Sequence, residues 1–243
     1  MKQKISIINY ILFALVLIGD GFYIATDSLA VKSITSALFV LIGIINFAYF
    51  IKTKQENKNF ALLLLIGLVF GMLGDIILEI QFIIGALLFA IGHVFYFFAF
   101  CAIEKFNLKN LIASACLFVP CTLFLVLAPI FDFGSIFMEI VCIAYALIIS
   151  CMTGKAVSNA IKSKTPLNIL LAIASILFTF SDLMLVLNVF GPSGLVFSIL
   201  CLGTYYPAQI LLAYSILFST NKKNWFISTL LHKKTSQIDL FFI

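Results

Sequence analysis

Eight apolar segments, each about as long as a lipid bilayer is thick, constrain the fold of this chain more than any other feature. They cover residues 5–25, 31–51, 60–78, 82–103, 108–129, 136–157, 168–189 and 194–218. A helix needs about 20 apolar residues to cross a hydrocarbon core of about 30 Å. The segments do not alternate with a period of two, so they predict helices and not the strands of a barrel.

The composition excludes a water-soluble fold. The chain has 243 residues, of which 63% are hydrophobic and 10% charged, and its mean hydropathy is +1.21. An ordinary soluble domain carries about 25% charged residues. We therefore predict an all-α, polytopic membrane protein in which residues 1–218 form a single bundle of eight transmembrane helices. Residues 219–243, which mix lysine with aromatic residues, are predicted to be a cytoplasmic or interfacial tail.

The lysines predict how the chain is oriented in the membrane. If the N-terminus is cytoplasmic, every lysine except Lys32 falls on the cytoplasmic side. Basic residues gather on that side of membrane proteins. We therefore predict that both termini are cytoplasmic and that the protein lies in the cytoplasmic membrane of a bacterium. Lys2 and Lys4 before an apolar run also fit a signal peptide, but the run is long enough to span, which favours an uncleaved helix.

Several functions are disfavoured by what the sequence lacks. The net charge of +5 comes from lysines in short loops, without arginine, so no nucleic-acid partner is predicted. The six cysteines lie in apolar segments without Cys-x-x-Cys spacing, as expected of small buried hydrophobic residues. No Gly-x-Ser-x-Gly, P-loop, dinucleotide-binding or His-Glu-x-x-His motif is present. No cofactor is predicted.

Two carboxylates lie within segments that otherwise read as membrane-spanning. Asp75 follows Gly74 in the third segment, and Asp182 follows Ser181 in the seventh. Such a charge costs about 2.5–3.5 kcal/mol on insertion scales, so it indicates a partner, a wet cavity or a function. With the orientation above, both lie in the outer half of the bilayer, which favours a shared cavity open toward the outer leaflet. The alternatives are a structural polar pair or a cation site.

His93 lies near the middle of the fourth segment. A buried histidine alone is more often a core residue, but beside two carboxylates it can orient one of them or move a proton. The glycines at 67, 71 and 74 permit close helix packing that would bring His93 near Asp75. The other histidine, His232, is in the tail, so a three-histidine zinc site is excluded. A carboxylate-only Mg²⁺ or Ca²⁺ site is disfavoured, and no metal is predicted.

Further polar side chains are candidates for binding a substrate. Tyr205 and Tyr206 lie one helical turn before Gln209, so the three share a face, lining a cavity or bonding to a neighbouring helix. Tyr145 in the sixth segment is also a candidate.

Lys32 and Glu79 complete the candidate binding residues. Glu79 lies on the same helix face as Asp75, one turn nearer the surface. Lys32 opens the second segment on the same side of the membrane, where it meets a lipid phosphate or extends to the interface as lysines commonly do.

These residues lie in blocks that resemble the YhhN family of membrane proteins. The blocks are Gly-Asp-Ile-Ile-Leu at 74–78, Gly-His-Val-Phe-Tyr at 92–96, Tyr-Ala-Leu-Ile-Ile-Ser-Cys-Met at 145–152, Phe-Thr-Phe-Ser-Asp-Leu-Met-Leu at 178–185 and Tyr-Tyr-Pro-Ala-Gln at 205–209. Lys32 also matches a family lysine, although Ser33 stands where the family usually has proline.

The family includes lysoplasmalogenases, so the resemblance implies hydrolysis of the vinyl ether bond of a lysoplasmalogen. The products would be a fatty aldehyde and glycerophospho-ethanolamine or -choline. It further implies that Asp75 and Asp182 share the acid–base roles, with a lysophospholipid or ether lipid as substrate. Three other functions are weighed beside it: a proton-coupled carrier of small molecules or lipids, a hydrolase of ester-linked lysolipids, and a structural membrane protein.

Overall fold

The computed structural model describes residues 2–53 and 57–218, which form eight long helices and no strand. The helices are α1 (Lys2–Thr26), α2 (Leu29–Lys52), α3 (Lys58–Leu78), α4 (Phe82–Ile103), α5 (Leu108–Leu127), α6 (Ile136–Lys162), α7 (Pro166–Phe190) and α8 (Leu195–Ser215), followed by a short 3₁₀ turn, η1 (Ile216–Phe218). All eight are long and apolar enough to cross a membrane. The protein is therefore an integral, multi-pass membrane protein, as predicted. The predicted tail at 219–243 lies outside the described residues.

Local signals in the connections explain where several helices begin. Asn107 accepts a hydrogen bond from the backbone N–H of Asn110, whose side chain in turn accepts from the Asn107 N–H, so α5 starts with a capping box. The Thr165 side chain caps α7 by accepting a hydrogen bond from the backbone N–H of Asn168, and Pro166 fills the first turn, where its missing N–H costs nothing.

The helix bounds agree closely with the apolar segments, and α6 shows the largest extension. It continues to Lys162, although the predicted segment ends at residue 157. Ser158 and Asn159, the first polar residues beyond that point, are buried against neighbouring helices, which keeps this part of the chain helical. Asn159 donates a hydrogen bond from Nδ2 to the Phe100 carbonyl of α4 at 3.2 Å.

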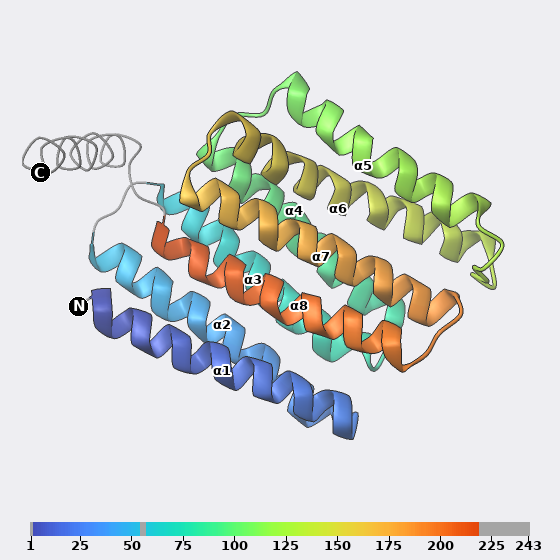
Figure 1. Ribbon diagram of the computed structural model, residues 1–243, viewed down its shortest axis with the longest axis horizontal. Coiled ribbons are helices and arrows are strands. Elements are labelled where there is room, and N and C mark those ends of the chain that lie inside the picture. Colours follow the sequence, from blue (N-terminus) through green and yellow to red (C-terminus); the bar gives the residue numbers. More distant parts are fainter. Residues whose placement is uncertain (1, 54–56, 219–243) are drawn as a thin grey trace, which may run out of the picture.

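The helices lie side by side in one bundle with roughly parallel axes (Figure 1). Sequential helices pack as antiparallel pairs, most extensively α3 with α4, α7 with α8, and α5 with α6. Contacts of α8 with α1, α2 and α3, and of α6 with α4 and α7, join these pairs. α1 and α2 form one flank and α5 forms the other (Figure 1).

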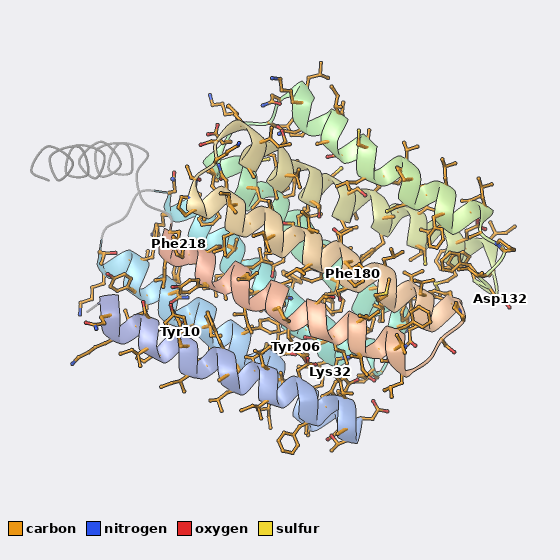
Figure 2. The ribbon with its side chains drawn as sticks, in the orientation of Figure 1. Tyr10, Lys32, Asp132, Phe180, Tyr206 and Phe218 are labelled. Atoms are coloured by element: carbon orange, nitrogen blue, oxygen red, sulfur yellow. The ribbon has the colours of Figure 1, made fainter. Side chains whose placement is uncertain are left out.

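The two ends of the bundle differ in their charged residues. The helix ends near Lys52, Lys58, Lys109, Lys162 and Lys164 all meet at the end where α1 begins. Lys32 lies toward the opposite end, the end that also carries Asp132 (Figure 2). Which of these ends faces the cytoplasm stays a prediction.

Candidate functional site

A cavity of about 510 Å³ opens into the bundle toward the end opposite the N-terminus. Residues of α1, α2, α3, α4, α7 and α8 line it. Its polar lining residues are Tyr23, Asp27, Lys32, Asp75, Glu79, Ser181, Asp182, Asn188, Ser198 and Tyr205. The cavity therefore gathers side chains that lie far apart in the sequence, including both intramembrane aspartates.

Asp75 lies on the α3 wall of this cavity and is only 3% exposed. Its Oδ2 accepts two hydrogen bonds, from the Ser36 hydroxyl at 2.5 Å and from the Tyr205 hydroxyl at 2.7 Å. Buried carboxylates are stable only with such partners. Ser36 on α2 and Tyr205 on α8 thus fix the orientation of the Asp75 carboxyl.

Glycines on α3 permit this close packing. A Cβ on Gly71 would lie 2.4 Å from Nε2 of Gln209, and a Cβ on Gly74 would lie 2.9 Å from the Phe89 ring. Only a residue without a side chain lets α4 and α8 approach α3 so closely beside Asp75.

Asp182 lies on the α7 wall and belongs to a three-residue cluster with His93 and Tyr145. Its Oδ2 accepts a hydrogen bond from the Tyr145 hydroxyl at 2.7 Å and lies 3.3 Å from Nε2 of His93. The Tyr145 oxygen and His93 Nε2 are 2.9 Å apart. Three helices, α4, α6 and α7, therefore hold one carboxyl in place.

The second nitrogen of His93 indicates which tautomer the site favours. Nδ1 is buried and has no hydrogen-bond partner, and the Phe178 ring packs edge-on at 4.6 Å between ring centroids. A buried N–H without an acceptor is costly, whereas a bare lone pair is less so. The neutral ring with its proton on Nε2 fits this environment, and that proton faces Asp182.

Lys32 and Glu79 form an ion pair at the cavity wall, with Nζ and Oε1 2.5 Å apart. Tyr23 donates a second hydrogen bond to the same oxygen at 2.7 Å. Glu79 lies just past the end of α3. Burial acts to raise the pKa of its carboxyl, but the hydrogen bonds from Lys32 and Tyr23 outweigh burial and hold that pKa below its usual value. Lys32 and Glu79, both predicted to bind a substrate, thus also form an ion pair with each other.

A chain of hydrogen bonds extends from Asp75 toward the middle of the bundle. Tyr96 donates to Oε1 of Gln209 at 2.8 Å, Gln209 donates to the Tyr205 hydroxyl at 3.0 Å, and Tyr205 donates to Asp75. Gln209 is fully buried and does not line the cavity. Its place is therefore behind Tyr205.

Tyr206 also lies behind the cavity wall. Its hydroxyl lies 3.4 Å from that of Ser36, and the residue is not among those that line the cavity.

Three residues that hydrogen-bond within the site were not predicted from the sequence as site residues: Ser36, Tyr23 and Tyr96. Each is a neutral hydroxyl in an apolar helix, which is common without any function. One signal for Ser36 was available, because it follows Lys32 by one helical turn and so shares its face. Among the described residues, no three histidine, cysteine, aspartate or glutamate side chains are grouped closely enough to hold a metal ion.

Fold and site together define a polytopic helical membrane protein in which two aspartates line one cavity within the bundle. The sequence model of the YhhN family matches residues 28–216, and the chain belongs to that family. The match includes every member of the two aspartate clusters and of the Lys32–Glu79 pair. No curated protein and no solved structure matches the chain.

Proposed function

We propose that this protein is a lysoplasmalogenase-like hydrolase that cleaves the vinyl ether bond of a single-chain ether lipid. Membership of the YhhN family is consistent with this activity. The observation that carries the proposal is that Asp75 and Asp182, from two different helices, line one cavity within the membrane-spanning bundle. Paired carboxyl groups are the usual acid–base machinery for reactions that pass through an oxocarbenium ion.

The chemistry of a vinyl ether suits two carboxyl groups. A carboxylic acid gives its proton to the β-carbon of the vinyl group, and the α-carbon becomes an oxocarbenium ion stabilised by the second, ionised carboxylate. Water adds to the α-carbon and loses a proton to that carboxylate. In the resulting hemiacetal the first carboxyl group, now ionised, takes the hydroxyl proton, and the second carboxyl group gives its proton to the glycerol oxygen. The carbon–oxygen bond to the glycerol breaks, an aldehyde and a glycerophospho-alcohol are released, and both carboxyl groups regain their starting states.

We assign the general acid to Asp75 and the ionised carboxylate to Asp182. Burial disfavours a charged carboxylate, and Asp75 is buried, whereas Asp182 is only partly buried. Oδ1 of each aspartate carries no hydrogen bond from the described residues, so each is available to a substrate or to water.

The proposal is tested with purified protein in lipid nanodiscs. Lysoplasmalogen is supplied, and aldehyde release is measured for the wild type, Asp75→Asn and Asp182→Asn. We expect the wild type to release aldehyde and each variant to lose about 100-fold or more in kcat, the range of general acid–base catalysis. Full turnover by either variant would exclude the mechanism.

The same preparation separates the alternatives. Release of fatty acid from an ester-linked lysolipid, without aldehyde from the ether lipid, would indicate an ester hydrolase. If neither product forms but a substrate crosses liposomes in a pH-dependent manner, the protein is a transporter, because buried carboxylates also serve proton relays.

A further inference from the structure

A second, smaller hollow adjoins the cavity on the other side of Asp182. It is a groove of about 40 Å³ between the α3–α4 hairpin, α6 and α7. Leu78, Phe82, Phe89, Asp182 and Leu185 line both the groove and the cavity. Asp182 therefore stands at the junction of two hollows.

The two hollows differ in chemistry. Eight of the ten residues that line the groove are apolar, and the other two, Asp182 and Tyr145, are hydrogen-bonded to each other. The cavity, by contrast, carries Lys32, Glu79 and Asp75. The groove thus offers a hydrocarbon surface, and the cavity offers charged and polar partners.

Aromatic residues adjoin the groove beside the loop that carries Asp132. Phe82 packs edge-on against Phe190 at 5.4 Å between ring centroids, and Phe133 packs against Phe190 at 5.2 Å. The backbone N–H of Asp132 donates to the Phe190 carbonyl at 2.7 Å, which holds this loop against α7. This apolar cover disfavours a water-soluble occupant for the groove. Nearby Leu87 and Ile140 are both 58% exposed and so face lipid.

We propose that the groove binds the hydrocarbon chain of the substrate next to the reacting bond, while the polar part of the same molecule occupies the cavity. This inference rests on the proposed function and adds an orientation to it. The vinyl ether then lies on the cavity side of the junction, between the two carboxyl groups, with its oxygen pointing away from the groove. A volume of about 40 Å³ is a few times what one water molecule needs, enough for the carbons nearest the bond, and the rest of the chain extends into lipid.

The groove contributes to the reaction by orienting the substrate and not by adding to its affinity. Lipid tails are as apolar as the groove, so moving a chain between them gains little. What the groove supplies is alignment of the vinyl group with the two carboxyl groups, and misplacement by about 1 Å can cost about 100-fold in rate. After cleavage the aldehyde remains on the lipid side and the glycerophospho-alcohol on the cavity side, so the two products leave by different routes.

The test narrows the groove and varies the length of the chain. Two vinyl ether substrates with the same glycerophosphocholine head are compared, one with a hexadecenyl and one with a propenyl chain. The variant is Ala86→Phe, which places a ring in the groove. Its matched control is Ala144→Phe, because Ala144 on α6 is exposed and lines neither hollow.

We expect Ala86→Phe to lower kcat/KM for the hexadecenyl substrate about tenfold more than for the propenyl substrate. Ala144→Phe should leave the ratio of the two values as in the wild type. If Ala86→Phe does not fold, Val141→Phe with Ile140→Phe as its control repeats the comparison at the α6 side of the groove. Suppose the wild type releases aldehyde, but Ala86→Phe lowers kcat/KM equally for both substrates or for neither. The groove is then not the binding site of the chain. If the wild type releases aldehyde from neither substrate, the proposed function itself fails.

Discussion

At the scale of single residues, the geometry of the site depends on hydrogen bonds that hold each aspartate from one side. The role of His93 can be tested separately, because its side chain contacts Asp182 and Tyr145 but lines neither the cavity nor the groove. We therefore expect His93 to position the Asp182 carboxylate without contacting the substrate. Without His93, the Asp182 carboxyl would keep only its hydrogen bond from Tyr145 and would be less well oriented.

We expect His93→Phe to lower kcat about 10- to 100-fold, because a hydrogen bond to a charged group contributes about 1.5–3 kcal/mol. His93→Gln, which keeps an N–H donor, should restore part of this loss. Aldehyde release and its pH profile are measured for both variants. A purely structural role would lower both variants' melting temperatures and leave the pH profile unchanged.

The Lys32–Glu79 pair gives a pH-dependent contribution to stability. Burial acts to raise the pKa of Glu79, but its hydrogen bonds from Lys32 and Tyr23 prevail and lower that pKa in the folded protein. A carboxyl of this kind binds fewer protons when folded, so it stabilises the fold above the ordinary glutamate pKa of about 4.3. The contribution is lost as the pH falls through the lower, folded value.

We therefore expect Glu79→Gln to lower the free energy of unfolding at neutral pH by about 1 kcal/mol or less, since the side chain is partly exposed. The melting temperatures of wild type and variant in detergent should converge as the pH is lowered into the acid range. A gap that is the same at every pH would mean that the charge of Glu79 is not the cause.

At the scale of helices, glycines decide how closely the α3–α4 pair can approach. A Cβ on Gly67 would lie 2.3 Å from the Tyr96 ring, which is far inside contact distance. Tyr96 in turn donates to Gln209 on α8. One methyl group at Gly67 would therefore disturb the packing of three helices and the hydrogen-bond chain that ends at Asp75.

We expect Gly67→Ala to destabilise the protein by about 1–3 kcal/mol, the usual cost of overpacking. The control is Gly203→Ala on α8, where an added Cβ meets nothing within 4 Å. Thermal unfolding in detergent compares the two. If both substitutions have the same effect, the close approach of Tyr96 to Gly67 does not limit the packing.

For the whole molecule, the eight helices could be predicted because their apolar lengths match the bilayer. The third and fourth segments end at Leu78 and Ile103, as α3 and α4 do. The end of α6 was missed because burial of Asn159 against α4 depends on tertiary packing.

The candidate site was predictable only in part. Asp75 and Asp182 stand out because charge is rare in such segments. Ser36 and Tyr96 do not, since hydroxyl side chains are ordinary there. The ion pair between Lys32 and Glu79 joins positions 47 residues apart, and no local pattern indicates it.

The orientation of the whole bundle is the remaining prediction from the sequence, and it decides on which side of the membrane the cavity opens. The lysine-rich end should be cytoplasmic, and the end with Asp132 should be outside. Asp132 and Lys164 are both exposed, and they lie at opposite ends of α6–α7. In a variant without the native cysteines, Asp132→Cys should react with a membrane-impermeant maleimide in intact cells. Lys164→Cys should react only after the cells are permeabilised, and the reverse pattern would place the cavity, and with it the release of the polar product, on the cytoplasmic side.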